Sequence, residues 1–161
     1  MANQNILIQI QQKKVKISKE QIIQRIHQVL KALEYENHEI SVVITDNAHI
    51  RELNYLYRGI DAPTNVLSFS MLEGEFGSVG TLLGDLVISA ERADEEARES
   101  GITTDERMSQ LLVHGILHLV GYDHDDDSED DEFVSENFRE MERKSLEILS
   151  LIEPNKNLDF F

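Results

Sequence analysis

Residues 111–124 read LLVHGILHLVGYDH, and this stretch decides both the fold and the chemistry of the chain. From 111 to 120 the apolar residues lie on every side of a helix, interrupted only by a glycine and by His114 and His118. A helix that is apolar all round packs in the centre of a fold rather than on its surface. We therefore expect a central buried helix, from about 105 to 120, that carries the two histidines.

The chain on either side of this helix alternates strands and helices. A period-two apolar pattern predicts a strand at 6–11, and a short β-branched run predicts one at 40–45. Further strands are expected at 66–70 and 81–88. Capping residues and helical periodicity predict helices at 19–34, 46–58, 89–100 and 105–120, and a last helix with an apolar face from Val134 to Leu149. We expect one α+β domain over 1–161, a four-stranded mixed sheet packed with helices around the central His-bearing helix, with a mobile tail at 153–161.

The helix expected between Asp46 and Gly59 is amphipathic. Its apolar face contains Ile50, Leu53, Leu56 and Tyr57. We expect these four side chains to pack on the sheet.

Three histidines form a candidate metal site. His114 and His118 are one helical turn apart and share a face. Gly121 suits a left-handed helix end, and His124 follows three residues later, so the turn can bring it back over the helix end. A hydrogen-bonded core histidine is the ordinary alternative, but two imidazoles in so apolar a helix both need polar partners. We predict one Zn²⁺ per chain, with a fourth position open as in catalytic sites.

The spacing of the three histidines is also that of the metzincin peptidases. In those enzymes the residue after the first histidine is a glutamate that acts as general base, and here it is Gly115. A metzincin-like metal cradle is therefore expected without peptidase chemistry of that type.

Charge and composition limit the possible partners. Fifteen Lys and Arg against 31 Asp and Glu give a net charge of −16, which repels polyanions. Six bases and one acid fall in 1–31, and these bases are either a solvated surface or a local patch that contacts phosphates. The absence of cysteine excludes disulfides, thiolate catalysis and iron–sulfur clusters. No signal-peptide pattern or membrane-spanning run is seen, so a cytoplasmic location is expected.

Three collinear segments make a more specific resemblance. Residues 114–124, together with 53–69 and 83–89, resemble the characteristic segments of the YbeY family, bacterial zinc-dependent endoribonucleases of ribosomal RNA maturation and ribosome quality control. The similarity extends over roughly 40–149. It implies that His114, His118 and His124 are the zinc ligands and that Arg58 has a functional role.

Other site residues have two interpretations each. Arg58 is either a cation that complements a helix C-terminus or a guanidinium that clamps phosphate in a forked geometry. Asn65 and Ser68 either line the same cleft and bind substrate or are a turn and a strand residue. Asp123 is a candidate to orient an imidazole or to assist catalysis. The nucleophile stays open between a metal-activated water, with or without Asp123, and the RNA 2′-hydroxyl.

The resemblance therefore implies a single-strand-specific, metal-dependent endoribonuclease acting near the 3′ end of 16S rRNA. Expected partners are single-stranded RNA, the small ribosomal subunit and its assembly factors, with no membrane and no DNA. The alternatives are a ribosome-assembly binding factor with structural zinc, which Gly115 in place of a base favours, and a zinc hydrolase of another substrate such as a peptide. Oligomeric state, cleavage position and the resident metal are not encoded in these patterns.

Overall fold

The computed structural model of the protein describes residues 5–71, 81–122 and 131–152, and for 131–138 it describes the backbone alone. The elements follow in the order β1 (Ile6–Ile10), α1 (Lys19–Ala32), β2 (Glu39–Thr45), α2 (Asn47–Arg58), β3 (Val66–Ser70), β4 (Leu82–Ser89), α3 (Ala90–Ser100), α4 (Thr104–Leu119) and α5 (Asp131–Ile152). These bounds agree closely with the predicted strands and helices. The expected tail at 153–161 lies outside the described residues.

The four strands form one mixed sheet in the order β1-β2-β4-β3. The β1–β2 and β2–β4 pairs are parallel, and β3 runs antiparallel to β4 at one edge. Because parallel neighbours need a crossover connection, α1 lies between β1 and β2 in the chain. The α+β class and the four-stranded mixed sheet are confirmed.

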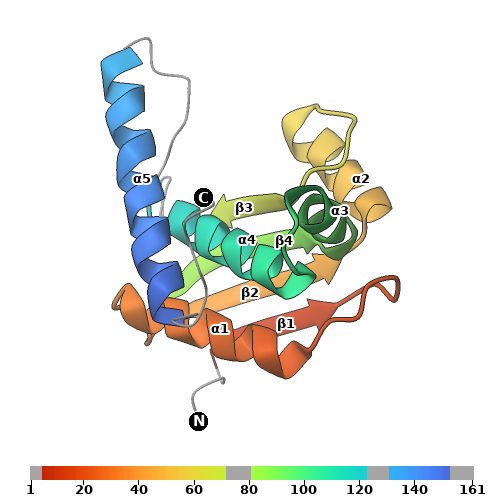
Figure 1. The fold of residues 1–161 in the computed structure, drawn as a ribbon, viewed down its shortest axis with the longest axis horizontal. Helices are drawn as coiled ribbons and strands as arrows, with labels where there is room; N and C mark the ends of the chain where they lie inside the picture. The colour runs from red at the N-terminus through yellow and green to blue at the C-terminus, as the bar shows by residue number, and fades with distance from the viewer. Residues whose placement is uncertain (1–4, 72–80, 123–130, 153–161) are drawn as a thin grey trace.

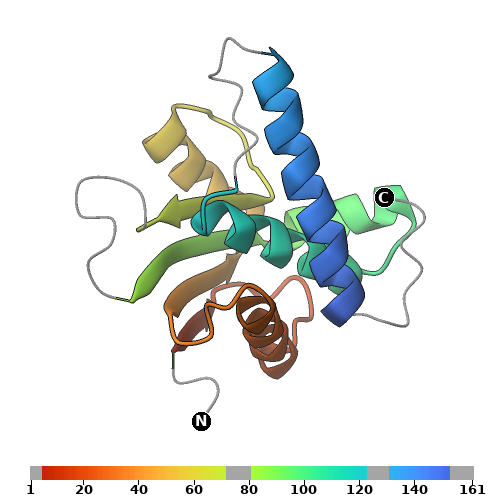
Figure 2. The ribbon, with the colours of Figure 1, turned by 90° about the vertical axis from the view of Figure 1, so that its left-hand side faces the viewer.

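Alternating residues of the strands face two separate hydrophobic clusters. The larger cluster joins Ile8, Val42 and Leu86 to the buried faces of α1, α4 and α5. The smaller one joins Val87 and Leu67 to α2 on the opposite face. Figure 2 shows α1, α4 and α5 together on one side of the sheet, and Figure 1 shows α4 crossing in front of the strands. Within the described residues, no helix is both long and apolar enough to cross a bilayer.

Capping residues define the helix ends. The side chains of four N-cap residues each accept a hydrogen bond from a backbone N–H three residues on, as predicted, namely Ser18, Asp46, Ser89 and Thr103. Helix α4 thus starts at a fixed residue, which sets the direction in which its histidines point.

The prediction for the apolar face of α2 was wrong at two residues. Leu56 is 70% exposed because it lies on the side of the helix away from Ile50. Tyr57 is on the same side as Ile50, but it is 62% exposed because β3 is the edge of the sheet, and its ring packs edge-on against Phe69. The buried position is instead taken by Asn54, which is 2% exposed.

Candidate active site

His114 and His118 project from adjacent turns of α4. Their ring centroids are 4.8 Å apart with an interplanar angle of 73°, and both side chains are half-buried. Nine of the sixteen residues of α4 are buried, so the helix itself is fixed by packing. The two imidazoles are therefore held beside each other by a rigid element.

Two backbone hydrogen bonds close the end of α4. The N–H of Gly121 donates to the His118 carbonyl at 3.1 Å, and the N–H of Tyr122 donates to the Leu117 carbonyl at 2.9 Å. Gly121 has φ 105°, so these two bonds form a Schellman ending. His124 and Asp123, two of the predicted site residues, lie outside the described residues.

The described residues include two of the predicted metal ligands. Among 5–71, 81–122 and 131–152, no group of three or more His, Cys, Asp or Glu side chains is arranged to hold a metal ion. The paired imidazoles of His114 and His118 are nonetheless two donors of the type that zinc prefers. This donor chemistry fits zinc, and the third predicted ligand, His124, lies outside the described residues.

Gly115 is explained by packing rather than by chemistry. A Cβ atom at this position would lie 2.7 Å from Leu86 Cδ2 and 3.3 Å from Val66 Cγ2. The position therefore faces the sheet, where α4 approaches β3 and β4 closely. A glutamate there would be buried against the strands.

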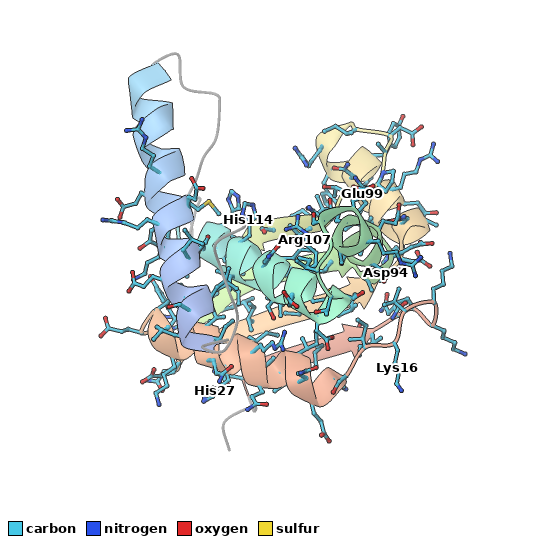
Figure 3. All side chains as sticks on the ribbon, in the orientation of Figure 1. Lys16, His27, Asp94, Glu99, Arg107 and His114 are labelled. Carbon is cyan, nitrogen blue, oxygen red and sulfur yellow. The ribbon has the colours of Figure 1, made fainter. Side chains whose placement is uncertain are left out.

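A pocket of about 260 Å³ lies beside His114. Helix α4 contributes Arg107, Gln110, Leu111 and His114, α5 contributes Met141, Glu142, Ser145, Leu146 and Leu149, and Asn65 closes the pocket just before β3. Figure 3 shows Arg107 and His114 on the stretch of α4 that lies between α5 and α3. The pocket joins two helices and a strand end at the candidate metal site.

A polar network on Glu96 fixes two of the pocket residues. Asn65 Nδ2 donates to the Glu96 carboxylate at 3.2 Å, and Arg107 Nε donates to it at 3.1 Å. Arg107 Nη1 also donates to Gln110 Oε1 at 2.6 Å. The charge of Arg107 is therefore balanced locally, and the amides of Asn65 and Gln110 have fixed orientations.

Arg58 lies at the exposed end of α2. Its Nη1 is 3.5 Å from Asn54 Oδ1, and Asn54 Nδ2 donates to the Ala62 carbonyl at 2.9 Å. Asp61 is engaged by another residue, because Arg51 Nε donates to it at 2.7 Å. That hydrogen bond lowers the pKa of Asp61 and raises the pKa of Arg51. The Arg58 guanidinium is therefore accessible, and within the described residues it has no carboxylate partner.

Ser68 ties β3 to the histidine helix. Its hydroxyl donates to the Gly115 carbonyl at 3.4 Å, and Ser70 donates to the Leu119 carbonyl at 2.9 Å. Ser68 and Arg58 do not line the pocket beside His114, whereas Asn65 does. The structure thus places His118 beside His114, and Asn65 with His114 in the pocket lining, and it leaves Arg58 on α2, which packs on the opposite face of the sheet from α4.

Sequence reasoning missed Arg107 and Gln110. They precede His114 by seven and four residues, so the helical period alone places them on its face of α4. The contributions of Glu142 and Ser145 depend on how α5 packs on α4, and no local pattern signals that.

Comparison with known proteins identifies the family. The family model described as Endoribonuclease YbeY matches residues 7–152. An Endoribonuclease YbeY of Aquifex aeolicus is 47% identical over 138 residues, covering 86% of this chain and 88% of that protein. One from Geobacter metallireducens is 46% identical over 126 residues, covering 78% and 80%.

This chain belongs to the YbeY family. The solution structure of TM1509 from Thermotoga maritima agrees in fold, with a TM-score of 0.58 and 26% identity over 94% of this chain and 99% of that one. The resemblance inferred from residues 53–69, 83–89 and 114–124 is thereby confirmed, and the YbeY match also covers the N-terminal strand and helix.

Proposed function

We infer that this YbeY-family protein is an endoribonuclease that acts in ribosomal RNA processing, and we propose that it cleaves single-stranded RNA near the 3′ end of 16S rRNA in the cytoplasm. The observation that supports the site is the pair of half-buried imidazoles, 4.8 Å apart on α4, beside a pocket of mixed polarity. The partners proposed are single-stranded RNA and the small ribosomal subunit with its assembly factors.

We propose that His114, His118 and His124 hold one Zn²⁺ per chain in a metzincin-like cradle on the central helix. When bound, zinc supplies Lewis-acid polarisation of a phosphoryl oxygen or water. The chain itself fixes the two described imidazoles on α4, which ends in a Schellman motif at Gly121, and we propose that His124 completes the site. Asp123 is proposed to orient the adjacent His124.

Arg58 is proposed to bind the phosphodiester. Its guanidinium is exposed, and among the described residues only its Nη1 has a hydrogen-bond partner, Asn54 Oδ1, so its other donors can bind a phosphate. Asn65 is proposed to contact RNA from the pocket, whereas the Ser68 hydroxyl positions α4 against β3. The alternative of a binding factor with structural zinc loses its main support, because the glycine at 115 follows from packing against Leu86.

The zinc site is tested by elemental analysis with a cleavage assay. We expect about one zinc per chain, since three protein ligands and an open position form a catalytic site. The single variants His114→Ala, His118→Ala and His124→Ala should each lose most of the zinc and the cleavage of single-stranded RNA, and a chelator should reproduce this loss. His38→Ala is the matched control, because His38 is half-buried outside α4. Full zinc content in all three of these histidine variants would disprove the site.

A further inference from the structure

The pocket beside His114 has an apolar floor and a polar rim. Leu111, Met141 and Leu149 are buried and line it from α4 and α5. Asn65, Gln110 and Ser145 add polar atoms around them. This combination is typical of sites that bind flat organic groups, with apolar contact to the faces and hydrogen bonds to the edge.

The charge of the pocket indicates which part of an RNA enters it. Arg107 is the basic residue of the lining, and its Nε already donates to Glu96 at 3.1 Å. The carboxylate of Glu142 also belongs to the lining. A phosphate would meet a compensated arginine and a like charge, so a neutral nucleobase is favoured over the backbone.

The fixed amides provide one donor and one acceptor. Gln110 Oε1 accepts from Arg107 at 2.6 Å, and among the described residues its Nε2 group has no acceptor, so it can donate to a ligand. Asn65 Nδ2 donates to Glu96 at 3.2 Å, and within the same part of the chain its Oδ1 has no donor, so it can accept from a ligand. The edge of every nucleobase carries neighbouring donors and acceptors, so this pair holds a base without selecting strongly among the four.

The size of the pocket is that of a small group. Its volume of about 260 Å³ lies just below the range of ~300–1,000 Å³ that is typical of sites for drug-sized ligands. A single base fits this volume better than a folded segment does. Its direct contact with His114 places such a base next to the candidate metal site.

We propose that this pocket binds one unstacked base of the RNA, that of a nucleotide adjacent to the cleaved phosphodiester. The assignment rests on the proposed ribonuclease function and adds the way in which the strand is held. Specific RNA recognition usually involves unstacked bases of single strands, which agrees with a preference for unpaired substrate.

The test uses zinc-loaded full-length protein and a short single-stranded RNA in which each position in turn lacks its base. For the unchanged protein, one abasic position next to the cut should lower kcat/KM about tenfold, mainly through KM, because binding of that base is lost. Ser145→Trp fills the pocket and should abolish this sensitivity. Ser150→Trp is the matched control, because Ser150 is exposed on the same helix and outside the lining.

A second variant and a fluorescence measurement distinguish loss of the pocket from misfolding of Ser145→Trp. Gln110→Ala removes the free donor without adding bulk, and it should reduce the abasic effect severalfold at the same position. A 2-aminopurine at that position should change fluorescence on mixing, before cleavage, in the Ser150→Trp protein but not in the Ser145→Trp protein.

Four outcomes are distinguishable. The base pocket is supported if one abasic position lowers kcat/KM of the unchanged protein and if this effect disappears in Ser145→Trp. Cleavage by the unchanged protein with no sensitive position overturns the base pocket and leaves the ribonuclease function standing. If Ser145→Trp keeps the abasic sensitivity of the unchanged protein but no longer binds isolated small ribosomal subunits, the pocket binds a protein partner instead. That result also overturns the base pocket. Absence of any RNA cleavage by the zinc-loaded protein overturns both proposals.

Discussion

Arg58 is the residue whose substitution best distinguishes an enzyme from a binding factor with structural zinc. Its side chain is exposed and free of carboxylates among the described residues, so Arg58→Ala should abolish most RNA cleavage while zinc content stays intact. Loss of an exposed helix-end cation should cost only ~0.3–1 kcal/mol of stability. Arg58→Lys should restore part of the rate, because an ammonium keeps the charge and loses the forked geometry. Cleavage rates, zinc content and melting temperatures are the measurements.

Arg51→Ala is the matched control for Arg58. Arg51 is an exposed arginine of the same helix, and its surface ion pair with Asp61 contributes little to stability. A fully active Arg58→Ala protein, or equal losses in the two variants, would remove Arg58 from the mechanism.

Gly115 gives a prediction about packing at one residue. In Gly115→Ala the new Cβ meets the buried Leu86 side chain, and overpacking of this kind costs ~1–3 kcal/mol, whereas the gain in helix propensity is ~1 kcal/mol. We therefore expect a net loss of stability in urea denaturation with zinc still bound. In a Leu86→Ala background the same change should no longer destabilise. A stabilised Gly115→Ala protein would show that the helix can move away from the sheet.

At the scale of elements, α4 was predictable and α2 was not fully so. The capping box at Thr103 and an apolar run on every side specify α4 locally, so its position and burial follow from the sequence. The exposure of Tyr57 depends instead on where the sheet ends, since β3 is an edge strand. Periodicity identifies the face of a helix, and tertiary packing decides how much of that face is covered.

The connection after α2 gives a prediction at the scale of an element. Asn54 is buried, donates to the Ala62 carbonyl and accepts from Arg58, so it links the helix, the following loop and the phosphate-binding candidate. Asn54→Ala should destabilise the protein by about 1–3 kcal/mol, because it leaves a carbonyl without its partner. It should also lower kcat/KM less than Arg58→Ala does.

A double-mutant cycle separates the two effects of Asn54. If Asn54 acts on cleavage through Arg58, adding Asn54→Ala to Arg58→Ala should cause no further loss of rate, although the stability loss remains. Additive losses of rate would instead give Asn54 a role of its own.

At the scale of the whole molecule, the candidate site combines parts that are distant in the sequence. The imidazoles of His114 and His118 were predictable because both are on one helix. The pocket was not, because Asn65 precedes β3 and Ser145 comes from α5, and only the packed fold brings them to α4. Local patterns therefore indicate the candidate metal ligands, while the residues that line the pocket are brought together only by the tertiary structure.

The net charge of −16 predicts a shallow salt dependence of RNA binding. Contact with RNA has to be local. Each phosphate that the protein neutralises releases counterions and adds only about 0.7 to the magnitude of the logarithmic salt slope for single strands. With a short RNA we expect a slope of about 2 or less, and Arg58→Ala should lower it by about 0.7.

The joint change of Lys13, Lys14 and Lys16 to Gln should leave the salt slope unchanged, because Lys14 pairs with Glu91 at 3.4 Å and Figure 3 shows Lys16 far from His114 across the molecule. Binding titrations over a range of salt concentrations measure these slopes. A clear reduction of the salt slope in the triple-lysine variant would show instead that the basic segment contacts the RNA. The RNA strand would then extend from α4 across to the connection between β1 and α1.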